Sequence, residues 1–196
     1  MHRRHLLAGA GALTLSFSLP ARAAANAAED FVSASILKGF DILNDAGAEP
    51  NERRQRFATF LLGLTDVRRV ALFLIGSYAE KAAPADLDDY AAAYRAYLMS
   101  VYQSYFALYA GQSLRLVSSR ERAPGDFVVS TEMTGGKTMP VDFRIRIDGA
   151  SALLLDVAVG GIWLALAQRA QFMSVLSQNN GDVKALSAHL RRIAQP

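Results

Sequence analysis

The sequence contains no cysteine, and only three of its 196 residues are histidine. The absence of cysteine excludes a disulfide framework and thiol chemistry. His2 and His5 lie in a leader that we expect to be removed, which leaves His189 in the mature chain. Ser-His-Asp triads, Cys-His pairs and zinc sites depend on residues that this chain lacks or has only once. We therefore expect a protein that is not an enzyme and that needs no metal or cofactor.

The N-terminus has the three parts of an export signal. Met1 to His5 is basic, Leu6 to Leu19 is small and apolar, and Ala21-Arg22-Ala23 matches an A-x-A cleavage site. The apolar run is shorter than the roughly 20 residues of a bilayer span, although a retained membrane anchor is the alternative. Arg3-Arg4 fits either a twin-arginine signal or an ordinary Sec signal. We expect residues 1–23 to be a signal peptide.

Removal of the signal also removes the excess of positive charge. The full chain has 21 basic and 18 acidic residues, and Arg3, Arg4 and Arg22 leave with the signal, so the mature chain is formally neutral. A neutral protein has little long-range field to attract polyanions, and we expect no nucleic-acid partner. The remaining length, about 173 residues, is ample for one core, so residues 24–196 are expected to form a single domain.

The first half of the mature chain has the apolar periodicity of helices. We expect helices at residues 24–44, 50–64, 67–79 and 84–110. Thr65-Asp66 supplies an N-cap for the third helix. Asp86, Asp88 and Asp89 fall in the first turns of the fourth, where carboxylates complement the helix dipole. We interpret these three as helix-start residues rather than as a calcium loop.

The fourth of these helices is unusually rich in tyrosine. Helical spacing places several apolar and aromatic residues on one face, namely Tyr94, Leu98, Val101, Tyr105 and Leu108. Two interpretations stay open: the face packs in the core with its hydroxyl groups at the edge, or part of it lines a cavity.

From Gln112 the period changes from about 3.6 to 2. Four strands are expected at residues 113–122, 126–134, 138–147 and 151–160, with short hairpin-like loops between them. Such strands form an antiparallel meander. Two more helices follow, ending near Gln178 and Ile193, so the fold class is α+β.

The fourth strand is apolar on both faces. Leu153, Leu155, Val157 and Val159 would form one face, and the opposite face, which includes Leu154, is mostly apolar too. A strand of this kind is covered on both faces or borders a cavity.

A series of short motifs resembles the toluene-tolerance or MlaC family. In chain order they are Gly76-Ser-Tyr78, Pro140-Val-Asp-Phe-Arg144, Asp156-Val157, Gly161-Ile162 and Arg169-Ala-Gln-Phe172. The resemblance covers essentially the whole mature chain. It departs from the family pattern at Ala79-Glu80, Gly160-Gly161 and Gln168, which favours a divergent branch such as the HpnM-like proteins associated with hopanoid biosynthesis.

The resemblance implies a curved sheet and helices that enclose an apolar pocket for acyl chains. The family binds phospholipid in the periplasm as part of the Mla transport system. A member is expected to carry phospholipid between an outer-membrane lipoprotein–porin complex and an inner-membrane ABC transporter, supporting outer-membrane lipid asymmetry and toluene tolerance. An HpnM-like accessory role in hopanoid biosynthesis or transport is the alternative. An enzyme on the same fold would have only Glu132, Asp142 and Asp156 as strand-borne acid–base groups.

The candidate site residues come from the strands and from aromatic positions on the helices. For lipid binding they are Tyr78, Tyr105, Leu116, Val129, Phe143, Ile145, Leu155, Val157, Trp163 and Phe172. The polar candidates for a head group or a partner protein are Arg144, Arg169 and Gln171. For Arg169, a buried ion pair with Asp142 or Asp156 is the alternative.

Overall fold

The computed structural model describes residues 21–108 and 111–195, so most of the expected signal peptide lies outside the described residues. The elements, in chain order, are α1 (Ala21–Leu43), α2 (Pro50–Gly63), α3 (Val67–Ile75), α4 (Tyr78–Lys81), α5 (Pro84–Leu108), β1 (Ser113–Ala123), β2 (Asp126–Thr134), β3 (Met139–Asp148), β4 (Ser151–Val159), β5 (Ile162–Trp163), α6 (Leu164–Gln178) and α7 (Val183–Ile193). The α+β class is confirmed. Among these elements no helix is both long and apolar enough to cross a bilayer.

The helix expected at residues 67–79 is two helices, α3 and α4. Asp66 caps α3 as expected, since its carboxylate accepts a hydrogen bond from the Arg69 backbone N–H at 3.0 Å. Gly76 ends α3 with φ 52° and ψ −129°, a conformation that residues with a Cβ rarely adopt. Apolar periodicity continues past Gly76, which is why the pattern alone did not reveal the break.

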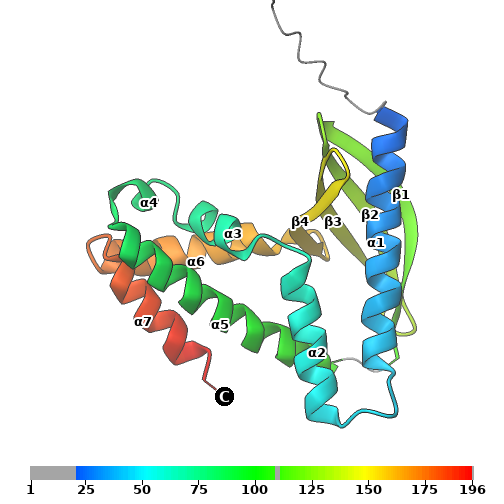
Figure 1. Ribbon diagram of the computed structural model, residues 1–196, viewed down its shortest axis with the longest axis horizontal. Helices are drawn as coiled ribbons and strands as arrows, with labels where there is room; N and C mark the ends of the chain where they lie inside the picture. The colour runs from blue at the N-terminus through cyan, green and yellow to red at the C-terminus, as the bar shows by residue number, and fades with distance from the viewer. Residues whose placement is uncertain (1–20, 109–110, 196) are drawn as a thin grey trace, which may run out of the picture.

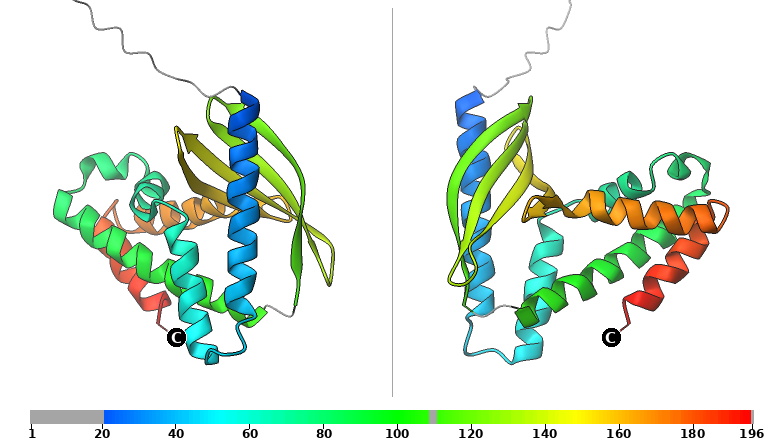
Figure 2. Two further views of the ribbon diagram at one scale, coloured as in Figure 1. Left: turned by 45° about the vertical axis from the view of Figure 1, so that its right-hand side comes forward. Right: turned by 180° about the vertical axis from the view of Figure 1, so that it is seen from behind.

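The strands form one antiparallel sheet in the order β1-β2-β3-β4-β5. The meander of the first four strands is therefore confirmed. The fifth strand was not predicted: Ile162 pairs with Val159, and Trp163 pairs with Ala158. Figure 2 shows the sheet curving as it passes from β1 to β4, with α6 leaving its end toward the other helices.

A β-bulge interrupts the pairing of β3 with β4. Arg144 pairs with Asp156, but the next β3 residue, Ile145, pairs with Leu154. Leu155 is the extra residue and has no partner on β3. A bulge of this kind shifts the in-and-out alternation of the strand that contains it.

The bulge changes which side chains of β4 share a face. Leu154 and Val157 both pack toward α1, although three positions separate them. Leu153 and Leu155 are not part of that packing. The expectation that Leu153, Leu155, Val157 and Val159 share one face was therefore wrong, because strict alternation does not continue through the extra residue.

The buried residues form two hydrophobic clusters, one among the helices and one under α1. The helical cluster joins α3, α5, α6 and α7 and includes Leu74, Tyr90, Tyr94, Phe172 and Leu186. The second cluster packs α1 against the sheet and includes Val32, Phe127, Val129 and Ile145. Figure 1 shows α1 along one face of the sheet and helices α3 to α7 as a separate group.

The tyrosines near the start of α5 belong to the helical cluster. The Tyr90 hydroxyl donates to the Ala71 carbonyl at 3.0 Å, and the Tyr94 hydroxyl donates to Gln168 Oε1 at 2.9 Å. Burial raises the pKa of both hydroxyls. Phe172 meets the Tyr94 ring edge-on, with centroids 6.0 Å apart. For these tyrosines the core-packing interpretation holds.

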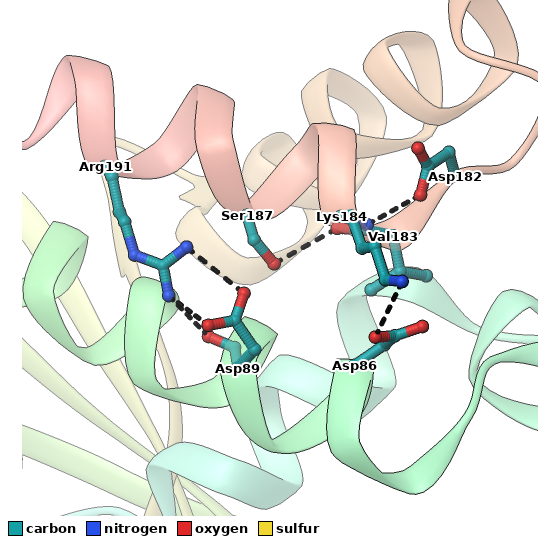
Figure 3. A network of polar contacts seen from close by, with 7 residues as sticks. All are labelled: Asp86, Asp89, Asp182, Val183, Lys184, Ser187 and Arg191. Carbon is teal, nitrogen blue, oxygen red and sulfur yellow. Dashed lines mark hydrogen bonds and ion pairs between the residues drawn. The ribbon is translucent and has the colours of Figure 1, made fainter.

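The acidic residues at the start of α5 fasten it to its neighbours (Figure 3). Lys184 of α7 lies 3.5 Å from Asp86, and Arg191 of α7 pairs with Asp89. The Arg191 hydrogen bond holds the pKa of Asp89 below its usual range. Asp88 pairs with an arginine of α3. No cluster suited to a metal ion occurs in the described part of the chain, and these carboxylates serve helix packing.

Candidate functional site

A cavity of about 500 Å³ lies where β4 meets the first turns of α3 and α6. Its apolar wall comes from Val70 and Phe73 of α3, from Trp163 and Leu166 near the start of α6, and from β4 residues 153–155. Residues 153–155 of β4 all border it, around the extra residue Leu155, while the Leu154 side chain packs toward α1. The bulge at Leu155 therefore shapes this larger cavity.

The bulge also ties β4 to the segment between α2 and α3. The Leu154 N–H donates to the Leu64 carbonyl at 2.8 Å, a bond outside the regular ladder. Leu154 is 8% exposed, and among the described residues it alone borders both the larger cavity and a second, smaller one.

The smaller cavity, of about 130 Å³, lies between α1, α2 and the sheet. It is lined almost entirely by apolar side chains, among them Phe31 and Phe40 of α1, Phe57 and Phe60 of α2, and Phe143 of β3. The two linings share Leu154. The smaller cavity lies on the sheet face that α1 covers, whereas the larger one includes Arg144 and Asp156 of the opposite face.

Asp156 holds the corner at which the sheet turns into α6. Its Oδ1 atom accepts from the Ala165 N–H at 3.0 Å and from its own neighbour Val157 N–H at 2.8 Å. Ala165 lies in the first turn of α6, where backbone N–H groups have no partner within the helix. Burial raises the pKa of Asp156, while these hydrogen bonds and the Arg144 charge oppose that shift. The side chain is a structural support for the cavity wall.

Replacing Asp156 with asparagine is expected to stabilise the fold at neutral pH. Because burial raises the folded-state pKa of Asp156, its ionisation disfavours the folded state. That cost is absent below the ordinary value of 3.8 and complete above the raised pKa. Asparagine keeps an oxygen for the Ala165 N–H and does not ionise. Urea unfolding across pH should show the gain vanishing as the pH falls toward 3.8.

The matched control is Asp156→Ala, which removes the acceptor as well as the charge. Loss of a helix-capping side chain costs about 1 kcal/mol, so the alanine variant should be less stable than the asparagine variant at every pH. An asparagine gain that grew toward acid pH would contradict this assignment.

Arg144 lines the larger cavity, and Asp126 positions its guanidinium group. Arg144 Nε donates to Asp126 Oδ1 at 3.0 Å and Nη2 donates to Oδ2 at 2.6 Å. The Asp126 side chain is 10% exposed, and the Arg144 hydrogen bond holds the pKa of Asp126 below its usual range. A two-pronged pair of this kind fixes the plane of the guanidinium.

Arg169 does not form the expected ion pair with Asp142 or Asp156. Its guanidinium donates to the Phe73 carbonyl and lies 5.3 Å from the centroid of the Phe73 ring. That carbonyl belongs to the last turn of α3, which has no helical partner for it. Arg169 therefore links α6 to α3, and its guanidinium group lies against Gly76.

The structure brings together five of the sequence-predicted residues at the two cavities. Leu155, Trp163 and Arg144 line the larger cavity, and Phe143 and Ile145 line the smaller one. These residues remain candidates for lipid contact.

Of the other predicted residues, those whose side chains the structure describes line neither cavity. Val129 and Val157 pack under α1, and Tyr78 and Phe172 pack among the helices. Leu116 is 36% exposed on the edge strand β1, and Gln171 is exposed on α6. The Tyr105 side chain lies outside the described residues.

Residues that the sequence did not single out supply much of the larger cavity. They are Arg69, Val70 and Phe73 of α3, Arg120 and Arg122 of β1, Leu153 and Leu154 of β4, and Leu166 of α6. The alternate spacing of Arg120 and Arg122 was a visible signal of a shared strand face, but nothing in the sequence placed α3 opposite that face.

Comparison with known proteins identifies the family of this chain. A family profile described as MlaC protein matches residues 35–192, which is most of the chain. The chain belongs to the MlaC family. No curated protein gives a significant match. Membership of the MlaC family supports lipid binding in the periplasm and indicates a binding or transport protein rather than a known class of enzyme.

Several solved chains have a similar fold, and one of them is informative. It is described as a phospholipid-binding protein from Ralstonia solanacearum in complex with a phospholipid. The match has a TM-score of 0.71 at 20% sequence identity and covers 85% of this chain and 96% of that chain. At this identity the likeness establishes the shared fold. Neither comparison singles out the HpnM-like branch.

Proposed function

We propose that the protein is a periplasmic carrier that moves phospholipid between an outer-membrane lipoprotein–porin complex and an inner-membrane ABC transporter. The observation that carries this proposal is the larger cavity, whose wall on β4 and α3 is largely apolar, together with the smaller apolar cavity under α1. The larger, at about 500 Å³, lies within the roughly 300–1,000 Å³ range of small-molecule sites. Membership of the MlaC family and the lipid complex of the similar fold support the same ligand class.

Apolar walls alone are sufficient for this role. Hiding one methylene group from water contributes about 0.8 kcal/mol, so ten buried methylenes would supply roughly 8 kcal/mol. That gross figure equals the free energy of a micromolar dissociation constant. In the proposed pose the acyl chains lie on Leu153 and Leu155, and the head group lies at the arginines of the larger cavity.

The expected signal cleavage is compatible with this site. Cleavage after Ala23 would leave Ala24 as the first residue, and Ala24 is 8% exposed and packs in the cluster under α1. The cluster would therefore keep its buried alanine in the mature protein.

The test is to produce the full precursor, purify the mature protein from the periplasm and identify what organic solvent extracts from it. The proposal predicts about one phospholipid for each protein, and transfer of labelled phospholipid between two vesicle populations when the protein is added. If a hopanoid is extracted instead, the phospholipid-carrier function is wrong and the accessory role in hopanoid biosynthesis or transport is supported. A protein that holds no lipid, even after incubation with vesicles, would contradict both.

A further inference from the structure

Three arginines at the larger cavity form no ion pair or hydrogen bond with the described residues through their guanidinium groups. Arg69 comes from α3, and Arg120 and Arg122 come from the edge strand β1. Within residues 21–108 and 111–195, none of their guanidinium groups forms an ion pair or a hydrogen bond. All three residues are exposed, so their charges are available to a ligand.

The sheet register gathers positive charge on the face turned away from α1. Arg120 pairs with Val128, Val128 pairs with Arg144, and Arg144 pairs with Asp156. Residues directly opposite one another on neighbouring strands share a face. This row therefore crosses four strands on one face, and α3 brings Arg69 to the same cavity.

The carboxylates nearby are already engaged. Asp66 accepts from the backbone N–H of Arg69, Asp156 caps the start of α6, and Asp126 holds Arg144. The cavity lining has four arginines and two aspartates, and Asp126 beside it pairs with Arg144, which leaves an excess of one positive charge. Its excess positive charge is therefore not neutralised by the chain itself, although the mature protein is neutral as a whole.

We infer that the larger cavity selects phospholipids whose head group carries a net negative charge over zwitterionic ones. This inference rests on the proposed lipid-binding function. A guanidinium group donates two parallel hydrogen bonds to a phosphate, and an anionic head group adds no cation to the site. A zwitterionic head group would bring an amine close to the same arginines, which would repel it. The leucines of β4 bind the acyl chains of either lipid, so the selection comes from the arginines.

The experiment equilibrates the mature protein with vesicles of equal parts phosphatidylglycerol and phosphatidylethanolamine. After the vesicles are removed by centrifugation, mass spectrometry gives the ratio of the two lipids on the protein. Each exposed arginine contributes a few tenths of a kcal/mol, so we expect phosphatidylglycerol to be enriched about fivefold. The enrichment should fall as salt is raised, because salt screens exposed charges.

The decisive variant carries Arg69→Gln, Arg120→Gln and Arg122→Gln together and should take up the lipids in the vesicle ratio. A control with Lys38→Gln, Arg95→Gln and Lys137→Gln removes the same net charge away from both cavities and should keep the enrichment. Circular dichroism confirms that each variant is folded. Should the arginine variant not fold, the salt dependence of the wild type is the remaining test.

The possible outcomes separate this inference from the proposed function. Wild-type protein that binds both lipids in the vesicle ratio overturns the selectivity and leaves the carrier intact, whereas protein that binds neither overturns the carrier. Inorganic phosphate alone should show no binding by calorimetry at millimolar concentration. Phosphate binding as tight as lipid binding would mean that the arginines form a free-anion site, which would also overturn the inference.

Discussion

Leu155→Glu is expected to abolish phospholipid retention in a protein that still folds. Leu155 is the bulged residue of β4, is only half-buried, and lines the larger cavity without belonging to either hydrophobic cluster. A carboxylate there would have to be desolvated beneath the acyl chains, which costs several kcal/mol. Lipid affinity should therefore fall at least about a hundredfold. Native mass spectrometry of the protein after incubation with vesicles measures the loss.

Leu116→Glu is the matched control. It introduces the same side chain on the same sheet, but Leu116 is 36% exposed on β1 and lines neither cavity. The control should keep wild-type retention. Equal retention by folded Leu155→Glu and wild type would exclude Leu155 from the lipid site. The sequence alone would have directed this test to Val157, which the structure places under α1.

Gly76→Ala is expected to lower the free energy of unfolding by about 2 kcal/mol or more. Gly76 has a positive φ of 52°, and an added Cβ would lie 2.6 Å from Nη2 of Arg169. The substitution strains the backbone between α3 and α4. It also clashes with the Arg169 guanidinium group, which links α6 to α3. For a chain of this size the midpoint of thermal unfolding should fall by roughly 4–8 °C. Urea denaturation gives the free energy directly.

Two further variants isolate the cause. Gly63→Ala is the control, because Gly63 ends α2 with no atom within 4 Å of an added Cβ, and it should be neutral or slightly stabilising. Adding Arg169→Ala to Gly76→Ala removes the steric contact but leaves the strained φ. Most of the loss should therefore remain in the double variant. Wild-type stability of Gly76→Ala would show that the backbone relaxes at no cost.

Periodicity predicted the element order because it depends on the chain's own pattern of apolar residues. The four long strands begin within a residue of their expected positions, and Asp66 caps the helix that it was expected to begin. The break at Gly76 was missed because it depends on one backbone conformation, which a run of apolar residues does not reveal. Strand starts and helix caps could be predicted because each depends on residue types near one another in the sequence. The Gly76 break could not, because it depends on a backbone conformation.

The cavity could be predicted only in part. The sequence showed that β4 is apolar on both faces, but the bulge at Leu155 decides which leucine faces which element, and a bulge has no unique sequence signature. Arg69 and Arg120 are far apart in the chain and come to the same cavity only in the folded structure. Net charge therefore did not reveal the local excess: the chain expected after signal cleavage is formally neutral, yet the cavity lining is positively charged.

The most direct test of the lipid site is photo-crosslinking with a phospholipid that carries a diazirine on its acyl chain. The protein is loaded, irradiated and digested, and mass spectrometry locates the labelled peptides. Label should concentrate on β4 at residues 153–155 and on α3 at Val70 and Phe73, which line the larger cavity. Bound lipid that labels only the exposed surface of α5 and α7, and neither of these segments, would contradict the site.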